Sequence, residues 1–149
     1  MRDSIGGSVT LVVIVVFIVI ALGYMAFNVN YTKAFRMKNK IISVYEDFNG
    51  DCSKAECKKE IKDYSNTIGY PRARDLSCPS GYNNLDNLYC VKKVYVQGKD
   101  LEKGVVNDLK VKYYYKIITK INLEIPVIRN IFNYRYFYIT GDTKSFEQK

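Results

Sequence analysis

A long apolar run near the N-terminus is the clearest pattern in the chain. The segment from Val9 to Phe27 reads VTLVVIVVFIVIALGYMAF, and no charged residue occurs between Asp3 and Lys33. A helix of this length measures about 28 Å, close to the ~30 Å hydrocarbon core of a bilayer. A lone segment in lipid has to be helical to satisfy its own backbone hydrogen bonds. The run therefore predicts a membrane-spanning helix over 9–27, preceded by a short leader over 1–8.

Two other interpretations of this run stay open. It could be the core helix of a soluble protein, although no other segment is apolar enough to bury it. It could also be a cleaved secretory signal, with Arg2 before the run and the small residues of Ala21-Leu22-Gly23 at the cut. Against cleavage, Tyr24-Met25-Ala26-Phe27 continues the apolar run past that point.

The helical pattern continues beyond the apolar run as an amphipathic segment over 28–49. Apolar residues recur there mostly at spacings of three and four, and charged residues fall mostly between them. No Pro or Gly interrupts the chain from Tyr24 to Asn49, and Asn49-Gly50 is a plausible helix end. We expect one helix from about Val9 to Phe48. Its apolar positions are Tyr31, Ala34, Phe35, Ile41, Ile42, Tyr45 and Phe48, and its charged positions are Lys33, Arg36, Lys38, Lys40 and Glu46.

The period changes to two in the second half of the chain. Strands are expected over Leu88–Gln97, Leu109–Ile121 and Tyr134–Thr140, with Pro126 in the last connection. In the middle strand, odd-numbered apolar residues face one way, whereas lysines with Tyr114 and Ile118 face the other, which we expect to be solvated. Residues 52–87 are expected to form loops and a short helix within Ala55–Tyr64. The sequence thus predicts an α+β fold, with the long helix packed on a small antiparallel sheet in a β-rich domain over 50–149.

Composition narrows the possible chemistry. The chain has no histidine, which excludes Ser-His-Asp triads, Cys-His dyads and the HExxH zinc motif. Its net charge of +8 suits anionic neighbours such as cell-wall polymers or lipid headgroups, or simply a solvated surface. Lysines interleaved with tyrosines could also hold nucleic acid, but no recognisable motif accompanies them, so no nucleic-acid partner is expected. We expect a non-enzymatic protein without cofactor or metal.

The four cysteines all lie beyond the helix, at Cys52, Cys57, Cys78 and Cys90. An even number in a domain with a small core fits two disulfides in an oxidising compartment, where each contributes about 2–4 kcal/mol. Three pairings are possible, of which Cys52–Cys57 with Cys78–Cys90 is the most local. Free thiols are one alternative. A zinc site is another, although the spacing between Cys78 and Cys90 is too long for a zinc knuckle.

The topology has conflicting signals. Lys33, Arg36, Lys38 and Lys40 follow the span, and the positive-inside rule then favours a cytoplasmic C-terminal domain. Disulfides require export instead. We give the cysteines precedence and expect a single-pass protein of the cell membrane with its C-terminal domain outside the cytoplasm.

The layout resembles that of type IV pilins and pseudopilins, most closely the TadE-like minor pseudopilins of tight-adherence pili. One likeness is Gly6-Gly7-Ser8 before the apolar run, and the other is the C-terminal stretch VKYYYKIITKINLEIPVIRNIFNYRYFYITGDTKSF. The resemblance implies cleavage by a prepilin-type peptidase after Gly6 or Gly7, with membrane lipid and other pilin-like subunits or assembly proteins as partners. Such pilins usually carry glutamate at the fifth mature position, where this chain has Leu11 or Val12.

The missing glutamate favours a minor or accessory subunit of a surface pilus or secretion apparatus over a major one. The alternative is a single-pass, membrane-anchored extracellular domain that binds cell-wall polymer or a protein partner. The state of the N-terminus separates the two, because only the pilin-like subunit has its leader removed.

Overall fold

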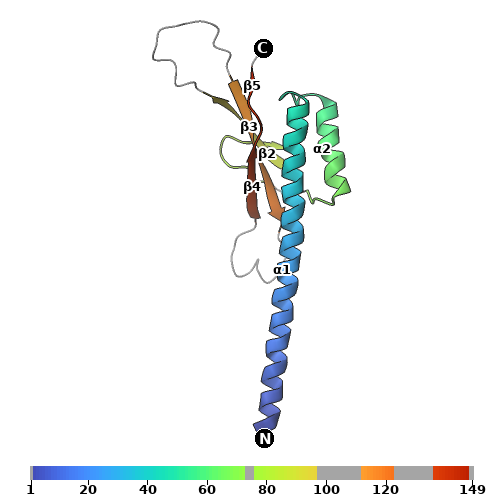
Figure 1. Ribbon diagram of the computed structural model, residues 1–149, viewed down its shortest axis with the longest axis vertical. Helices are drawn as coiled ribbons and strands as arrows, with labels where there is room; N and C mark the ends of the chain where they lie inside the picture. The colour runs from blue at the N-terminus through green and yellow to red at the C-terminus, as the bar shows by residue number, and fades with distance from the viewer. Residues whose placement is uncertain (1, 73–75, 97–111, 123–135, 148–149) are drawn as a thin grey trace, which may run out of the picture.

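The computed structural model describes residues 2–72, 76–96, 112–122 and 136–147, with the backbone alone for 2–6, Asn122 and Tyr136. One long helix projects well beyond a small body made of a short helix and an antiparallel sheet (Figure 1). The elements are α1 (Arg2–Asp47), α2 (Ala55–Thr67), β1 (Asn83–Leu85), β2 (Tyr89–Val96), β3 (Lys112–Asn122), β4 (Tyr136–Asp142) and β5 (Phe146–Glu147). The expected α+β fold class is confirmed.

The helix α1 is continuous over 46 residues. It begins at Arg2 rather than at Val9, because the leader contains no proline and two glycines do not suffice to interrupt a long helix. It ends as the sequence predicts. Asn49 and Gly50 have φ of 51° and 78°, and the Gly50 N–H donates to the Tyr45 carbonyl at 2.7 Å. Together with the bond from the Asn49 N–H to the Glu46 carbonyl at 3.2 Å, this is a Schellman motif that closes the helix.

Only the C-terminal part of α1 packs on the body. Its core-facing residues are Ala34, Met37, Ile41, Val44 and Tyr45, of which the first four are fully buried. Ala34, Ile41 and Tyr45 were expected in this face, whereas Met37 and Val44 were missed. Tyr31 and Phe35 were wrongly included, since they are 43 % and 40 % exposed. They lie on a neighbouring stripe of the helix, because the apolar face is wider than the part that the sheet covers.

The sheet is an antiparallel meander in the order β1-β2-β3-β4, and β5 pairs with β3 beyond the end of β4. The register pairs Val91 with Ile117 across β2 and β3, and Ile117 with Gly141 across β3 and β4. The three predicted strands are confirmed within the described residues. Gln97, Leu109–Val111, Tyr134 and Arg135 lie outside that part of the chain, as does Pro126.

One face of the sheet packs on α1. The Thr119 hydroxyl, fully buried in β3, donates to the Ala34 carbonyl of α1 at 3.1 Å. Further along, the Tyr45 ring meets Tyr115 edge-on at 5.0 Å and its hydroxyl lies 3.4 Å from that of Tyr89. The remaining core residues include Val91, Ile117 and Ile121 from the sheet with Ile61 from α2. The body is therefore joined rigidly to the helix.

The opposite face of the sheet is only partly solvated, contrary to the sequence prediction. Ile118 and Lys120 are 5 % and 4 % exposed, whereas Lys112 is exposed and Lys116 is half-buried. Leu76 and Cys90 pack with Ile118 in a second, small core. The alternation of β3 separates its two faces correctly, but the end of the outer face lies under a covering loop, residues 76–78, which carries no periodic signal.

Candidate functional site

The N-terminal part of α1 exposes a continuous apolar surface. Every large hydrophobic residue from Val9 to Met25 is at least 50 % exposed, and Phe17 reaches 71 %. The helix is long and apolar enough to cross a membrane, and its most apolar stretch has no buried residue. Soluble proteins rarely leave such a surface open to water. Something other than the described residues of this chain must cover it.

A row of aromatic rings marks the transition from the exposed part of α1 to the packed part. Phe27, Tyr31 and Phe35 follow one another at intervals of four residues, with ring centroids 6.2 and 6.3 Å apart. Lys38 caps the row with its ammonium 4.4 Å from the Phe35 centroid. Phe137, the second residue of β4, meets Phe27 edge-on with ring centroids 6.4 Å apart. The row was not predicted from the sequence, because Tyr31 and Phe35 were expected in the core-facing stripe of the helix.

Two of the four basic residues after the span bind the folded body. The Lys33 ammonium donates to the Gly69 carbonyl at 3.2 Å, and Lys40 pairs with Glu60 of α2 at 2.6 Å. Lys38 lies over Phe35, and Arg36 is exposed. These cations therefore help to hold α2 and the following turn against α1, in addition to any effect on topology.

The first disulfide, Cys52–Cys57, closes the turn between α1 and α2, with its Cα atoms 5.3 Å apart. Cys57 is fully buried in the main core, whereas Cys52 is half-buried beside it. The Asp51 carboxylate accepts hydrogen bonds from the Ser53 hydroxyl and N–H, which hold its pKa below the usual range. This bridge fixes the start of α2 directly after the end of α1.

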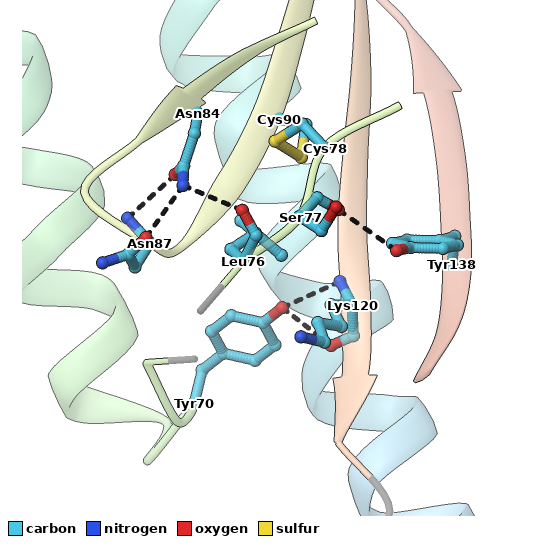
Figure 2. The surroundings of a disulfide bond; sticks show 9 residues. All are labelled: Tyr70, Leu76, Ser77, Cys78, Asn84, Asn87, Cys90, Lys120 and Tyr138. Atoms are coloured by element: carbon cyan, nitrogen blue, oxygen red, sulfur yellow. Dashed lines mark hydrogen bonds between the residues drawn. A yellow bond between two sulfur atoms is a disulfide. The ribbon is translucent and has the colours of Figure 1, made fainter. Parts of the chain in front are cut away.

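The second disulfide, Cys78–Cys90, fastens the covering loop to the outer face of β2, with Cα atoms 5.7 Å apart (Figure 2). Polar contacts hold the loop on either side of the bridge. The Asn84 amide donates to the Leu76 carbonyl at 3.0 Å, and the Tyr138 hydroxyl donates to the Ser77 carbonyl at 3.2 Å. Both disulfides use the most local of the three possible pairings.

Tyr70, which precedes the covering loop in the chain, points its hydroxyl at Lys120 of β3 (Figure 2). The hydroxyl donates to the Lys120 carbonyl at 2.7 Å and accepts from the Lys120 N–H at 2.9 Å. Burial raises the pKa of Tyr70 to about 12, and burial also raises the pKa values of Tyr45 and Tyr89. All three phenols therefore stay neutral near pH 7 and act as hydrogen-bonding groups of the core.

Among the described residues, no group of three or more His, Cys, Asp or Glu side chains could hold a metal ion. A shallow hollow between α1 and α2 is lined by charges of both signs, among them Lys40, Glu56, Lys59 and Glu60. Lys40 and Glu60 already neutralise each other there.

The residues proposed for leader cleavage lie in α1. Gly6 and Gly7 are both helical, and a side chain placed at Gly7 would meet no other atom within 4 Å. Leu11 and Val12, which stand where a pilin glutamate is expected, are 63 % and 59 % exposed on the apolar surface. A Cβ at Gly7 would therefore have open space around it.

Comparison with protein-family models, with curated proteins and with solved structures gives no match at all. The function of this protein is therefore inferred from its own sequence and geometry.

Proposed function

We propose that this protein is a membrane-anchored, pilin-like minor or accessory subunit of a surface pilus or secretion apparatus. The observation that carries the proposal is the division of α1 into two parts. Its first part is an exposed apolar rod, and its second part is the spine of a disulfide-bearing domain. A single helix with these two parts can hold its domain at a membrane and later pack against the helices of neighbouring subunits.

The disulfides support placement of the domain outside the cytoplasm. Both Cys52–Cys57 and Cys78–Cys90 are fully formed within one small domain, and such bonds persist in oxidising compartments. The basic residues after the span oppose this orientation under the positive-inside rule. A dedicated export route that reads the N-terminal leader would override the charge rule, which agrees with the Gly6-Gly7-Ser8 sequence.

The apolar part of α1 favours an accessory role in assembly. Its surface from Val9 to Met25 carries no acidic side chain that could pair with the N-terminal amine of a neighbour. Association with neighbouring subunits would then depend on van der Waals packing between helices. Such packing selects its partner less specifically than a charge pair in lipid does. This surface suits a subunit that is present in few copies beside other subunits that carry the acidic side chain.

Mass spectrometry of the mature protein from its own cells tests the proposal. We expect the chain to start at Gly7 or Ser8. An intact Met1 would contradict processing by a prepilin peptidase and favour a simple anchored domain. A start at Tyr24 would indicate a secreted domain and contradict both membrane-anchored functions.

One observation favours the second candidate, an anchored domain that binds a cell-wall polymer. Beyond the end of α1 the core tyrosines continue outward as Tyr113 and Tyr95, and Tyr95 is 53 % exposed. The Lys93 ammonium lies 3.8 Å from the centroid of Tyr113. Exposed aromatic rings beside a lysine suit an anionic polymer with apolar sugar faces. Binding of purified wall polymer that is lost in Tyr95→Ala, in a chain with intact Met1, would support this candidate.

A further inference from the structure

The N-terminal end of β4 lies beside α1 at the level where the apolar rod, residues 9–27, ends. Phe137 meets Phe27 edge-on with ring centroids 6.4 Å apart, and the Phe137 side chain is 49 % exposed. Phe27 is the last residue of the uninterrupted apolar run, and the first charged side chain after it is Lys33. An aromatic residue far away in the sequence is thus brought to the upper limit of the apolar rod.

The rise per residue of α1 gives the height of Phe137 relative to the bilayer. The segment 9–27 covers about 28 Å of the ~30 Å hydrocarbon core, and each headgroup layer adds roughly 5–8 Å. Tyr31 lies about 6 Å beyond Phe27 along the axis. When 9–27 spans the bilayer, the rings of Phe27, Tyr31 and Phe137 therefore all lie at the boundary between the acyl chains and the headgroups.

Phe137 cannot leave this level without breaking contacts between β4 and α1. Gly141 lies so close to α1 that an added Cβ would come within 2.8 Å of the Ile42 and Lys38 side chains. At the far end, the Lys144 N–H donates to the Glu46 carboxylate at 2.7 Å. Because α1 runs without a break from the span into the body, the strand has a fixed height above the bilayer.

We propose that the N-terminal end of β4, led by Phe137, sits in the lipid headgroup layer, so that the sheet rests directly on the membrane. This inference depends on the proposed membrane anchor. Tyrosine is enriched at that depth because its ring is amphipathic, and phenylalanine is one of the apolar side chains that bury at the boundary between headgroups and acyl chains. Phe27 and Tyr31 from α1 and Phe137 from β4 together form the contact. The occupant is phospholipid, and a neighbouring subunit is the competing occupant.

Tryptophan fluorescence can test the depth, because the chain has no tryptophan of its own. Three single-tryptophan variants of the full chain are reconstituted at high dilution in phosphatidylcholine vesicles. Phe17→Trp lies at the middle of the span, and Phe137→Trp at the proposed contact. Tyr95→Trp is the control, since it pairs with Tyr113, which lies eight residues and thus about 27 Å along β3 from the partner of Phe137, toward the end of the sheet remote from the apolar rod.

Each variant is measured with phospholipids brominated near the terminal methyl or near the carbonyl end of the acyl chains. We expect Phe17→Trp to lose most emission to the deep bromines. Phe137→Trp should emit at shorter wavelength than Tyr95→Trp and lose more emission to the shallow bromines than to the deep ones. Tyr95→Trp should lose none to either.

The outcomes separate the inference from the anchor. If Phe17→Trp is quenched but Phe137→Trp behaves like Tyr95→Trp, the anchor holds and the headgroup contact is refuted. A blue shift of Phe137→Trp that appears only at high protein density would assign the contact to a neighbouring subunit and also refute it. If Phe17→Trp is quenched by neither set of bromines, the membrane anchor and the headgroup contact are refuted together. Should Phe137→Trp not fold, Tyr138→Trp replaces it, because Tyr138 lies at nearly the same height on the opposite face of β4 and is 45 % exposed, and the change gives up its hydrogen bond to the Ser77 carbonyl.

Discussion

Removal of the Cys78–Cys90 disulfide is expected to destabilise the domain more than removal of Cys52–Cys57. The double variants Cys78→Ala/Cys90→Ala and Cys52→Ala/Cys57→Ala make a matched pair. In each bridge one cysteine is fully buried, Cys90 or Cys57, and the other is half-buried. The packing lost with the sulfur atoms is therefore similar, and the main difference is the length of the closed loop.

Loop closure gives the magnitude. The bridged residues are 12 positions apart for Cys78–Cys90 and 5 apart for Cys52–Cys57. The chain-entropy relation then gives about 3 kcal/mol for the longer loop and about 2 kcal/mol for the shorter one. We expect the longer bridge to contribute roughly 0.7 kcal/mol more to the free energy of unfolding. Loss of the small outer core around Leu76 and Ile118 would increase the difference further.

Guanidinium denaturation of the full chain in detergent provides the measurement, with near-ultraviolet circular dichroism of the tyrosines as the signal. The tyrosine signal reports the sheet and the helix end, because Tyr45 of α1 contacts both Tyr89 of β2 and Tyr115 of β3 there. Equal losses in the two variants, or a larger loss for the Cys52–Cys57 pair, would refute the assignment of the stabilisation to loop closure. In reducing agent, where all bridges are open, the denaturation curves of the two variants should merge with each other, because each variant has lost one buried and one half-buried sulfur atom.

Two further predictions concern single residues of the body. Gly50→Ala should cost about 1–2 kcal/mol for a left-handed backbone, plus about 1 kcal/mol or more for overpacking, because its Cβ would come within 3.1 Å of the Phe146 ring. The control Gly69→Ala (φ of 63°) should show the backbone cost alone in the same denaturation assay, since its Cβ would meet only the end of Lys33. Burial raises the pKa of Tyr70 from 10 to about 12, so the unfolded chain loses this proton first and stability falls as the pH rises through that window. Base titration of Tyr70→Phe should give a slope shallower by up to about 1.4 kcal/mol per pH unit, and an unchanged slope would contradict the assignment.

Periodicity was enough to predict α1 and the strands β2, β3 and β4, whereas β1, which lies in a stretch expected to be loop, and β5 were missed because strands of two or three residues are too short to show a period. The long apolar run and its amphipathic continuation fixed the path of α1, and alternation fixed which residues of β3 share a face. Asn49-Gly50 marked the helix end because few residues accept a positive φ there. The cysteine spacing favoured the observed bridges only as the most local choice among three. These features depend on short segments of sequence, which is why they could be read directly.

Features that depend on contacts between distant segments were missed. Nothing in the alternation of β3 distinguishes the exposed Lys112 from the buried Lys120, because burial of the latter depends on a loop some 50 residues earlier, held by Tyr70. Likewise, Tyr31 and Phe35 fit an apolar helical face, and only the limited width of the sheet leaves them outside the core. The contact between Phe27 and Phe137 joins two ends of the chain that share no local pattern.

If the apolar part of α1 spans a bilayer as proposed, the unbroken course of the helix makes the body move with the spanning part. Asp47 lies about 30 Å beyond Phe27 along the axis. A membrane helix commonly tilts by about 20°, and such a tilt would carry the top of the sheet sideways by about 10 Å. In the proposed membrane-anchored protein, reorientation of the apolar part within the lipid, by a change of bilayer thickness or by docking of another helix, would thereby be amplified at the top of the sheet without any hinge.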